Sequence, residues 1–196
     1  NVVTYWLEQY FKDPRYLVVD DKPVVGIYNF PNLVSFFGSV DGVRAELDYL
    51  RQACQREGFD GCTILLANSD SNPTKMQQWK DAGFDCLYCY NWDNACYLVE
   101  NQMSDMEAQR DTGIMDMMAT LSMGRDHTPW ERAAGGICTP EDFGRLLDWT
   151  VDEFIPSLPS ESLGKKFIMF DNWNEYGESH FLAPTTLHGF EYINII

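Results

Sequence analysis

Short apolar segments alternate with amphipathic segments along the whole chain, and this alternation constrains the fold more than any other feature. Five strands buried on both faces are predicted by apolar runs at residues 22–28, 62–67, 85–90, 117–122 and 166–170. Helical periodicity predicts helices at residues 41–57, 74–82, 95–112 and 139–154. Buried strands separated by helices indicate a parallel sheet covered by helices. We therefore expect one α/β domain over residues 1–196, which is either an open sheet or part of a (β/α)8 barrel.

The chain is strongly acidic, with a formal net charge of −16 from 30 Asp and Glu residues against 14 Lys and Arg residues. Binding to phosphate backbones needs clustered positive charge, so we expect no nucleic-acid partner, and anionic membranes are disfavoured as well. No run of about 18 apolar residues is present, so we expect no insertion into a membrane. No signal peptide is recognised at the start of the chain.

The six cysteines include one pair, Cys86 and Cys89, with a spacing that occurs in zinc and redox sites. Both fall in the predicted strand 85–90, where residues three apart point to opposite faces, so the two thiols should diverge. A second metal candidate is an acid cluster whose spacing defines no coordination geometry: Asp171, Glu175, Glu178 and His180. No glycine-rich phosphate-binding motif follows any strand. We expect neither a metal site nor a cofactor.

Polar and aromatic residues gather directly after the predicted strands, at positions that a parallel sheet brings to one edge. This carboxyl edge is where active sites form in open α/β sheets and in barrels. Polar loops are common there, but large aromatic residues beside acids are typical of sites that stack sugar rings. The candidate substrate-binding residues are Asn29, Trp92, Asp93, Asp126, Trp130, Trp173, Asn174, Tyr176 and His180.

Two carboxylates, Glu175 and Glu178, follow the last predicted strand and stand three residues apart among aromatic residues. In glycosidic cleavage one carboxylic acid protonates the leaving oxygen, and a carboxylate acts on the other side of the ring. Mutual repulsion would help to keep one of the two protonated near neutral pH. Spacing alone does not distinguish inverting from retaining cleavage. Either acid could instead be an ordinary surface residue, but the neighbouring Trp173, Asn174 and Tyr176 favour a catalytic pair.

Three segments resemble, in order, segments of the WbsX-like family, which bears the name glycosyltransferase WbsX and is related to glycoside hydrolase family 99. Residues 173–179, Trp-Asn-Glu-Tyr-Gly-Glu-Ser, resemble the family's Trp-Asn-Glu-Trp-x-Glu-Gly segment. Residues 122–130 resemble its Gly-Trp-Asp-Asn-x-Pro segment. Residues 10–24, with Asp-Pro-Arg-Tyr and then Lys-Pro, resemble the part of the family that leads into a central strand.

This resemblance implies a (β/α)8 barrel that acts on glycans. It implies that Glu175 is the base that deprotonates the sugar 2-hydroxyl and that Glu178 is the general acid/base. Tyr176 stands where the family has Trp, and Ser179 where it usually has Gly; both acids are kept. Such barrels have eight strands and only five are predicted, so the chain is interpreted as the C-terminal portion of a barrel. A missing N-terminal segment or a second chain would complete it.

The function expected first is a glycoside hydrolase that cleaves a polysaccharide or oligosaccharide. One alternative is a glycosyltransferase of surface-polysaccharide synthesis, which would need a nucleotide-sugar site; only Arg125 and a few lysines are candidates for its basic groups. The other alternative is a truncated, non-catalytic glycan-binding module. A hydrolase would be expected in the periplasm or outside the cell, and a transferase in the cytoplasm.

Overall fold

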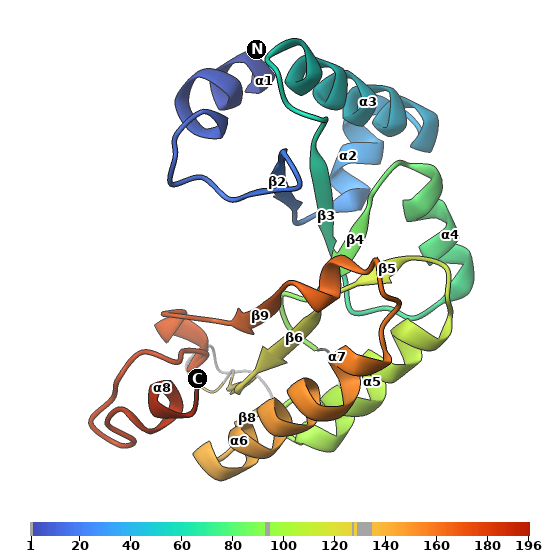
Figure 1. Cartoon of the computed structure of the whole chain (residues 1–196). Coiled ribbons are helices and arrows are strands. Elements are labelled where there is room, and N and C mark those ends of the chain that lie inside the picture. Colours follow the sequence, from blue (N-terminus) through green and yellow to red (C-terminus); the bar gives the residue numbers. More distant parts are fainter. Residues whose placement is uncertain (1, 93–94, 127, 129–134) are drawn as a thin grey trace. The chain divides into compact units, whose positions relative to one another are not determined.

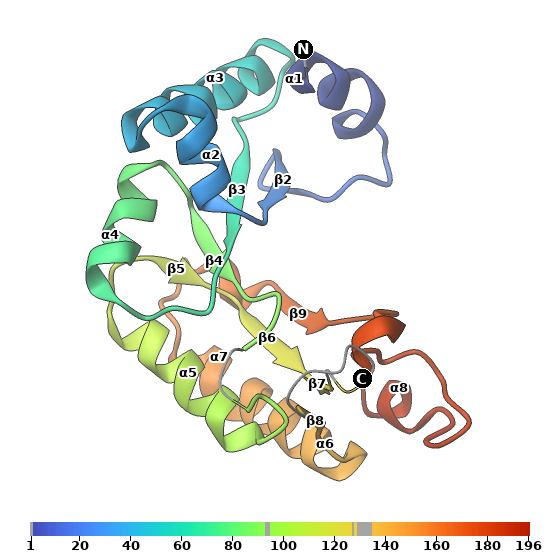
Figure 2. The ribbon, with the colours of Figure 1, turned by 180° about the vertical axis from the view of Figure 1, so that it is seen from behind.

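The computed structural model of the 196-residue chain describes all residues except 1, 93–94, 127 and 129–134 (Figures 1 and 2). The chain divides into two compact units. The first comprises residues 1–67 and 73–87, and the second comprises residues 68–72 and 88–196. The single domain expected from the sequence stays a prediction.

The first unit is built on a pair of parallel strands. β2 (Lys22–Ile27) pairs with β3 (Thr63–Ala67) in a register that runs from Val24↔Thr63 to Ile27↔Leu66. The short β1 (Val18–Val19) pairs with β2 in the antiparallel sense, and β4 (Cys86–Tyr88) is the neighbour of β3. The parallel pairing of β2 and β3 agrees with the predicted α/β class.

The helices of the first unit are α1 (Val2–Trp6) with the π-helical turn η1 (Leu7–Phe11), α2 (Phe30–Phe37), α3 (Val40–Arg56) and α4 (Pro73–Asp81). α3 buries the stripe of Val43, Leu47 and Leu50 that its periodicity predicts. The sequence patterns did not predict α2. It begins after Asn29, whose side-chain oxygen accepts a hydrogen bond of 2.9 Å from the Asn32 N–H.

The second unit contains the parallel pair β6 (Ala119–Ser122) and β9 (Ile168–Asp171), in register from Ala119↔Ile168 to Ser122↔Asp171. α5 (Val99–Asp111) and α6 (Pro140–Trp149) pack against β6 and against each other (Figure 1). Thr139 caps α6 by accepting a hydrogen bond of 3.1 Å from the Asp142 N–H, and Pro140 follows it, as the sequence predicts.

Short elements complete the second unit. They are β5 (Asp116–Met117), β7 (Gly124–Arg125), β8 (Gly136–Ile137), the π-helical turn η3 (Thr150–Phe154), α7 (Ile155–Ser157), the 3-10 turns η4 (Leu163–Lys165) and η5 (Tyr176–Glu178), and α8 (Glu191–Ile195). Leu121, Phe143, Leu146 and Phe154 are fully buried and form much of the core between β6, α6 and η3.

Several predicted elements have other bounds in the structure, and two of them differ in an instructive way. The strand predicted at 117–122 is divided at Met118 into β5 and β6. The helix predicted at 95–112 begins only at Val99, because Ala95 has a φ of 43°, a left-handed conformation that a right-handed helix excludes.

All six cysteines are buried free thiols, including Cys86 and Cys89. Burial is the main cause that raises the pKa of Cys138 to about 12, which makes its reactive thiolate form scarce at neutral pH. In the part of the chain that the structure describes, no helix combines the length and the apolar character needed to cross a membrane.

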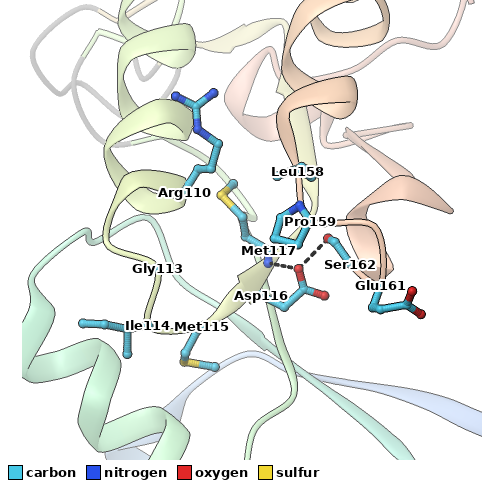
Figure 3. A pocket seen from close by; sticks show the side chains of 10 residues that line it. All are labelled: Arg110, Gly113, Ile114, Met115, Asp116, Met117, Leu158, Pro159, Glu161 and Ser162. Atoms are coloured by element: carbon cyan, nitrogen blue, oxygen red, sulfur yellow. Dashed lines mark hydrogen bonds between the residues drawn. The ribbon is translucent and has the colours of Figure 1, made fainter.

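A cavity of about 310 Å³ lies beside β5 in the second unit, away from the predicted site residues (Figure 3). Its walls are largely apolar, with Met115, Met117 and Leu158 among them. The Asp116 carboxylate at its edge accepts hydrogen bonds from the Met117 N–H (2.9 Å), the Ser162 hydroxyl (2.5 Å) and the Leu163 N–H (2.7 Å). Asp116 therefore holds the turn that begins η4 against β5.

We expect Asp116→Asn to lower the free energy of unfolding by about 1–3 kcal/mol, because an amide cannot accept all three of these hydrogen bonds. Urea unfolding followed by circular dichroism measures the change. Asp152→Asn, at an exposed position of η3, is the matched control and should stay within about 0.5 kcal/mol of the parent. Equal unfolding midpoints for the two variants would contradict the role of Asp116.

Candidate functional site

The loop that carries Glu175 and Glu178 begins directly after β9. Asn172 starts it: its side-chain oxygen accepts hydrogen bonds of 3.0 Å from the N–H groups of Asn174 and Glu175. The chain then makes the single turn η5, and Glu175 and His180 pair through two backbone hydrogen bonds of 3.1 Å. This pairing closes residues 175–180 into a compact loop, so the spacing of the two acids is held by local backbone structure.

Glu178 also contacts Arg125, at the end of β7, and Asp126, which follows it. The Asp126 N–H donates a hydrogen bond of 2.9 Å to the Glu178 carbonyl oxygen. Arg125 Nη1 lies 3.8 Å from Glu178 Oε2, and both side chains are partly buried. The carboxylate of Glu178 therefore faces a cation, whereas Glu175 is exposed to solvent. The sequence patterns did not place Arg125 beside the acid pair.

Glycine at position 124 allows the segment that carries Arg125 and Asp126 to pack closely against β8 and Tyr97. Gly124 has a φ of 96°, and a Cβ there would lie 2.4 Å from the Gly136 carbonyl oxygen and 2.9 Å from Tyr97 Cβ. β7 and β8 pair in the antiparallel sense at this point. The side chain of Asp126 accepts hydrogen bonds from the backbone N–H and the hydroxyl of Thr128, so its carboxylate is already oriented.

Two aromatic side chains of the loop are exposed: Trp173 at 59% and Tyr176 at 61%. The Tyr176 ring packs against Phe181, with centroids 4.9 Å apart. Exposed aromatic faces beside carboxylates are what a sugar-binding surface needs. Sequence analysis named Trp173 and Tyr176 but missed Phe181, because its contact with Tyr176 depends on the turn between them.

Two of the residues predicted to bind substrate lie in the core instead. Trp92 is 1% exposed, and its Nε1–H donates a hydrogen bond of 2.9 Å to the Thr120 carbonyl oxygen. His180 is 0% exposed. Neither presents surface to a substrate as placed, because each finds its polar partner on or beside β6 and packs its ring in the interior.

The other residues predicted to bind substrate lie at different places in the chain. Asn174 is exposed on the loop, next to the acid pair. Asn29 belongs to the first unit, where it caps α2. Asp93 and Trp130 lie outside the described residues.

A buried polar cluster of Ser122, Asp171 and His180 underlies the loop. His180 Nε2 is 2.8 Å from Asp171 Oδ2 and 3.1 Å from Ser122 Oγ. Burial raises the pKa of Asp171, and the neighbouring His180, Ser122 and Arg125 offset part of that rise. Within the described ranges, no group of three or more His, Cys, Asp or Glu side chains is arranged to hold a metal ion.

The fold and the loop define an α/β protein with an acid pair after β9. Its family follows from comparison with known protein families. The family model described as glycosyltransferase WbsX matches residues 1–114 and 96–196, two overlapping stretches that together span the chain. The chain therefore belongs to this family, which confirms the resemblance of its motifs. No curated protein matches it.

Solved structures related to glycoside hydrolase family 99 have a similar fold. The GH99 endo-alpha-mannosidase from Bacteroides thetaiotaomicron matches with a TM-score of 0.58 and 16% identity, over 93% of this chain and 51% of that one. The same enzyme in complex with BIS-TRIS-propane matches with the same TM-score and identity, over 93% and 53%. The chain thus spans about half the length of that enzyme.

The loop conformation bears on one departure from the motif that the family resemblance implies. Ser179, at the position where the family usually has Gly, has a φ of 49°, which is a left-handed conformation. A side chain there costs about 1–2 kcal/mol, and glycine removes that cost while it adds about 0.5–1 kcal/mol of chain entropy to be lost on folding. The family's glycine therefore has a conformational reason that the motif alone did not reveal.

We expect Ser179→Gly to raise the free energy of unfolding by roughly 0.5 kcal/mol, the difference between these two effects. Ser104→Gly, at an exposed position inside α5, is the control of opposite sign and should lower it by roughly 0.5 kcal/mol. Urea unfolding of both variants measures the difference. A destabilised Ser179→Gly variant would contradict the conformational explanation.

Proposed function

We propose that this protein is a glycan-active enzyme, and specifically a glycoside hydrolase that uses Glu175 and Glu178. One observation carries the proposal: the two acids share one closed loop at the carboxyl end of β9, and the same loop segment exposes the rings of Trp173 and Tyr176. Acids provide proton transfer at the glycosidic oxygen, and aromatic faces hold the sugar.

In this proposal Glu178 is the general acid/base and Glu175 is the base that acts on the sugar. Glu178 is partly buried and faces Arg125, whose charge would stabilise the carboxylate that remains once Glu178 has given its proton to the leaving oxygen. Glu175 is more exposed, where it can reach a hydroxyl of a bound sugar. In the same proposal the carboxylate of Asp126, which is oriented by Thr128, binds sugar hydroxyl groups.

We further propose that the chain is the C-terminal portion of a (β/α)8 barrel. The match to about half of a GH99 structure supports this, as does the difference between the two strands of the second unit. β6 is buried along its whole length, whereas Ile168, Met169 and Phe170 of β9 are only partly buried. A further strand, from an upstream segment or a second chain, would cover that side of β9 and complete the barrel.

The structural neighbour indicates which substrate to test first. Because that neighbour is an endo-alpha-mannosidase, an α-mannan is the first polysaccharide to test on this protein. The family's name points to the second candidate function, a glycosyltransferase. A transferase would need an added nucleotide-sugar, whereas a hydrolase would release reducing ends without one.

We expect the protein to release reducing sugar from an α-mannan or a related polysaccharide in the absence of nucleotide-sugars. Glu175→Gln and Glu178→Gln should each reduce kcat by about a hundredfold or more and leave glycan binding in place, because they remove proton transfer but keep side-chain shape. Reducing-end release and isothermal titration with the same glycan measure the two quantities.

Glu161→Gln is the matched control, since Glu161 is an exposed acid away from the loop and should leave kcat unchanged. Unchanged turnover by both loop variants would contradict the catalytic roles. Glycan binding without turnover by the parent protein would favour a non-catalytic module, and turnover only with a nucleotide-sugar would favour a transferase.

A further inference from the structure

The side chain of His180 lies between the ends of the two parallel strands of the second unit. Its Nε2 atom is 3.1 Å from Ser122 Oγ, at the end of β6. It is also 3.1 Å from the carbonyl oxygen of Asp171 and 2.8 Å from Asp171 Oδ2, at the end of β9. Ser122 and Asp171 are register partners, so one ring nitrogen contacts both members of the last pair of the β6–β9 ladder.

These contacts indicate which nitrogen carries the proton. Nε2 makes hydrogen bonds with two oxygen atoms, Ser122 Oγ and the Asp171 carbonyl oxygen, so we assign the proton to Nε2. Asp171 Oδ2 lies 2.8 Å from Nε2 but has no hydrogen-bond partner among the described residues. Among the described residues Nδ1 has no hydrogen-bond partner. An unpaired lone pair at Nδ1 costs less than a buried N–H without an acceptor, which supports this position of the proton.

The cluster has the residue types of a nucleophilic triad but not its arrangement. In such a triad the two nitrogens of the histidine face the serine and the acid separately. Here Ser122 and Asp171 both contact Nε2, and Ser122 and His180 are 0% exposed. The Ser122 hydroxyl oxygen also accepts a hydrogen bond from the Gly124 N–H. The cluster is therefore a structural one without access to a substrate.

The backbone of His180 connects this buried cluster to the acid pair. Its N–H donates to the Glu175 carbonyl oxygen and its carbonyl oxygen accepts from the Glu175 N–H, both at 3.1 Å. Glu178 lies between these two residues in the closed loop. A displacement of the His180 ring would consequently shift the backbone that carries both carboxylates.

We infer that His180 is a positioning residue: through Nε2 it anchors the loop of Glu175 and Glu178 to the ends of β6 and β9, and it does not contact the substrate. This inference deepens the proposed function, and its kinetic consequence rests on that function. Its structural consequence does not, because the anchoring of the loop is a property of the protein without any glycan.

Hydrogen–deuterium exchange and steady-state kinetics of His180 variants test the inference. His180→Phe keeps a ring of similar size but removes the Nε2 donor, so exchange in residues 172–182 should accelerate about tenfold. With an α-mannan as substrate, kcat should fall by about ten- to a hundredfold and KM should change by less than about threefold, because the acids are misplaced while the exposed binding surface remains. His180→Gln has an amide that can donate to the same oxygens, so it should restore most of the slow exchange and most of kcat.

His188→Phe is the matched control, because His188 lies in a loop outside the cluster and should leave exchange in residues 172–182 unchanged. If His180→Phe does not fold, Ser122→Ala removes one contact of Nε2 and should accelerate the same exchange by about threefold. Exchange at the parental rate in each folded variant would overturn the inference, as would a raised KM with unchanged kcat. Accelerated exchange in a protein whose parent releases no sugar would support the anchor and contradict the hydrolase.

Discussion

The register of β6 against β9 is the constraint on which the candidate site depends. It sets Ser122 beside Asp171 at the carboxyl end of both strands, and the His180 ring contacts both. A shift of one residue would turn these side chains to the opposite face of the sheet and separate the three groups. The loop that follows β9 would then lose the link to the core that His180 provides.

A second consequence of this arrangement is that the polar residues have two different roles, one group being buried and structural and the other lying at the surface. Asp171, Ser122 and His180 have a structural role, since His180 Nε2 makes hydrogen bonds with the Ser122 hydroxyl and the Asp171 carbonyl oxygen in the interior. Glu175 and Glu178 remain at the surface of the same loop, one exposed and one partly buried beside Arg125. Burying polar groups costs free energy unless they form hydrogen bonds, so the geometry of this cluster is restricted. The loop is attached to the cluster through His180, and its position is restricted as well.

The sequence predicted much of the second unit, and the failures have physical reasons. The cap at Thr139, the parallel strands and the loop with both acids were all predictable from local patterns. The inward placement of Trp92 was not, because a tryptophan beside an acid has the same local pattern whether its ring stacks on a sugar or packs in a core. Its hydrogen bond to the Thr120 carbonyl oxygen depends on a distant strand.

By itself the sequence determined the family, the α/β class and the acid pair, since these depend on periodicity and on the order of residues in short motifs. Only the tertiary structure decided which polar residues face solvent and which are buried. His180 illustrates the difference: it stands two residues from Glu178 in the chain, yet its side chain is in the core. The reason is that exposure depends on partners such as Ser122 and Asp171, which the paired strands bring to it and which no local motif encodes.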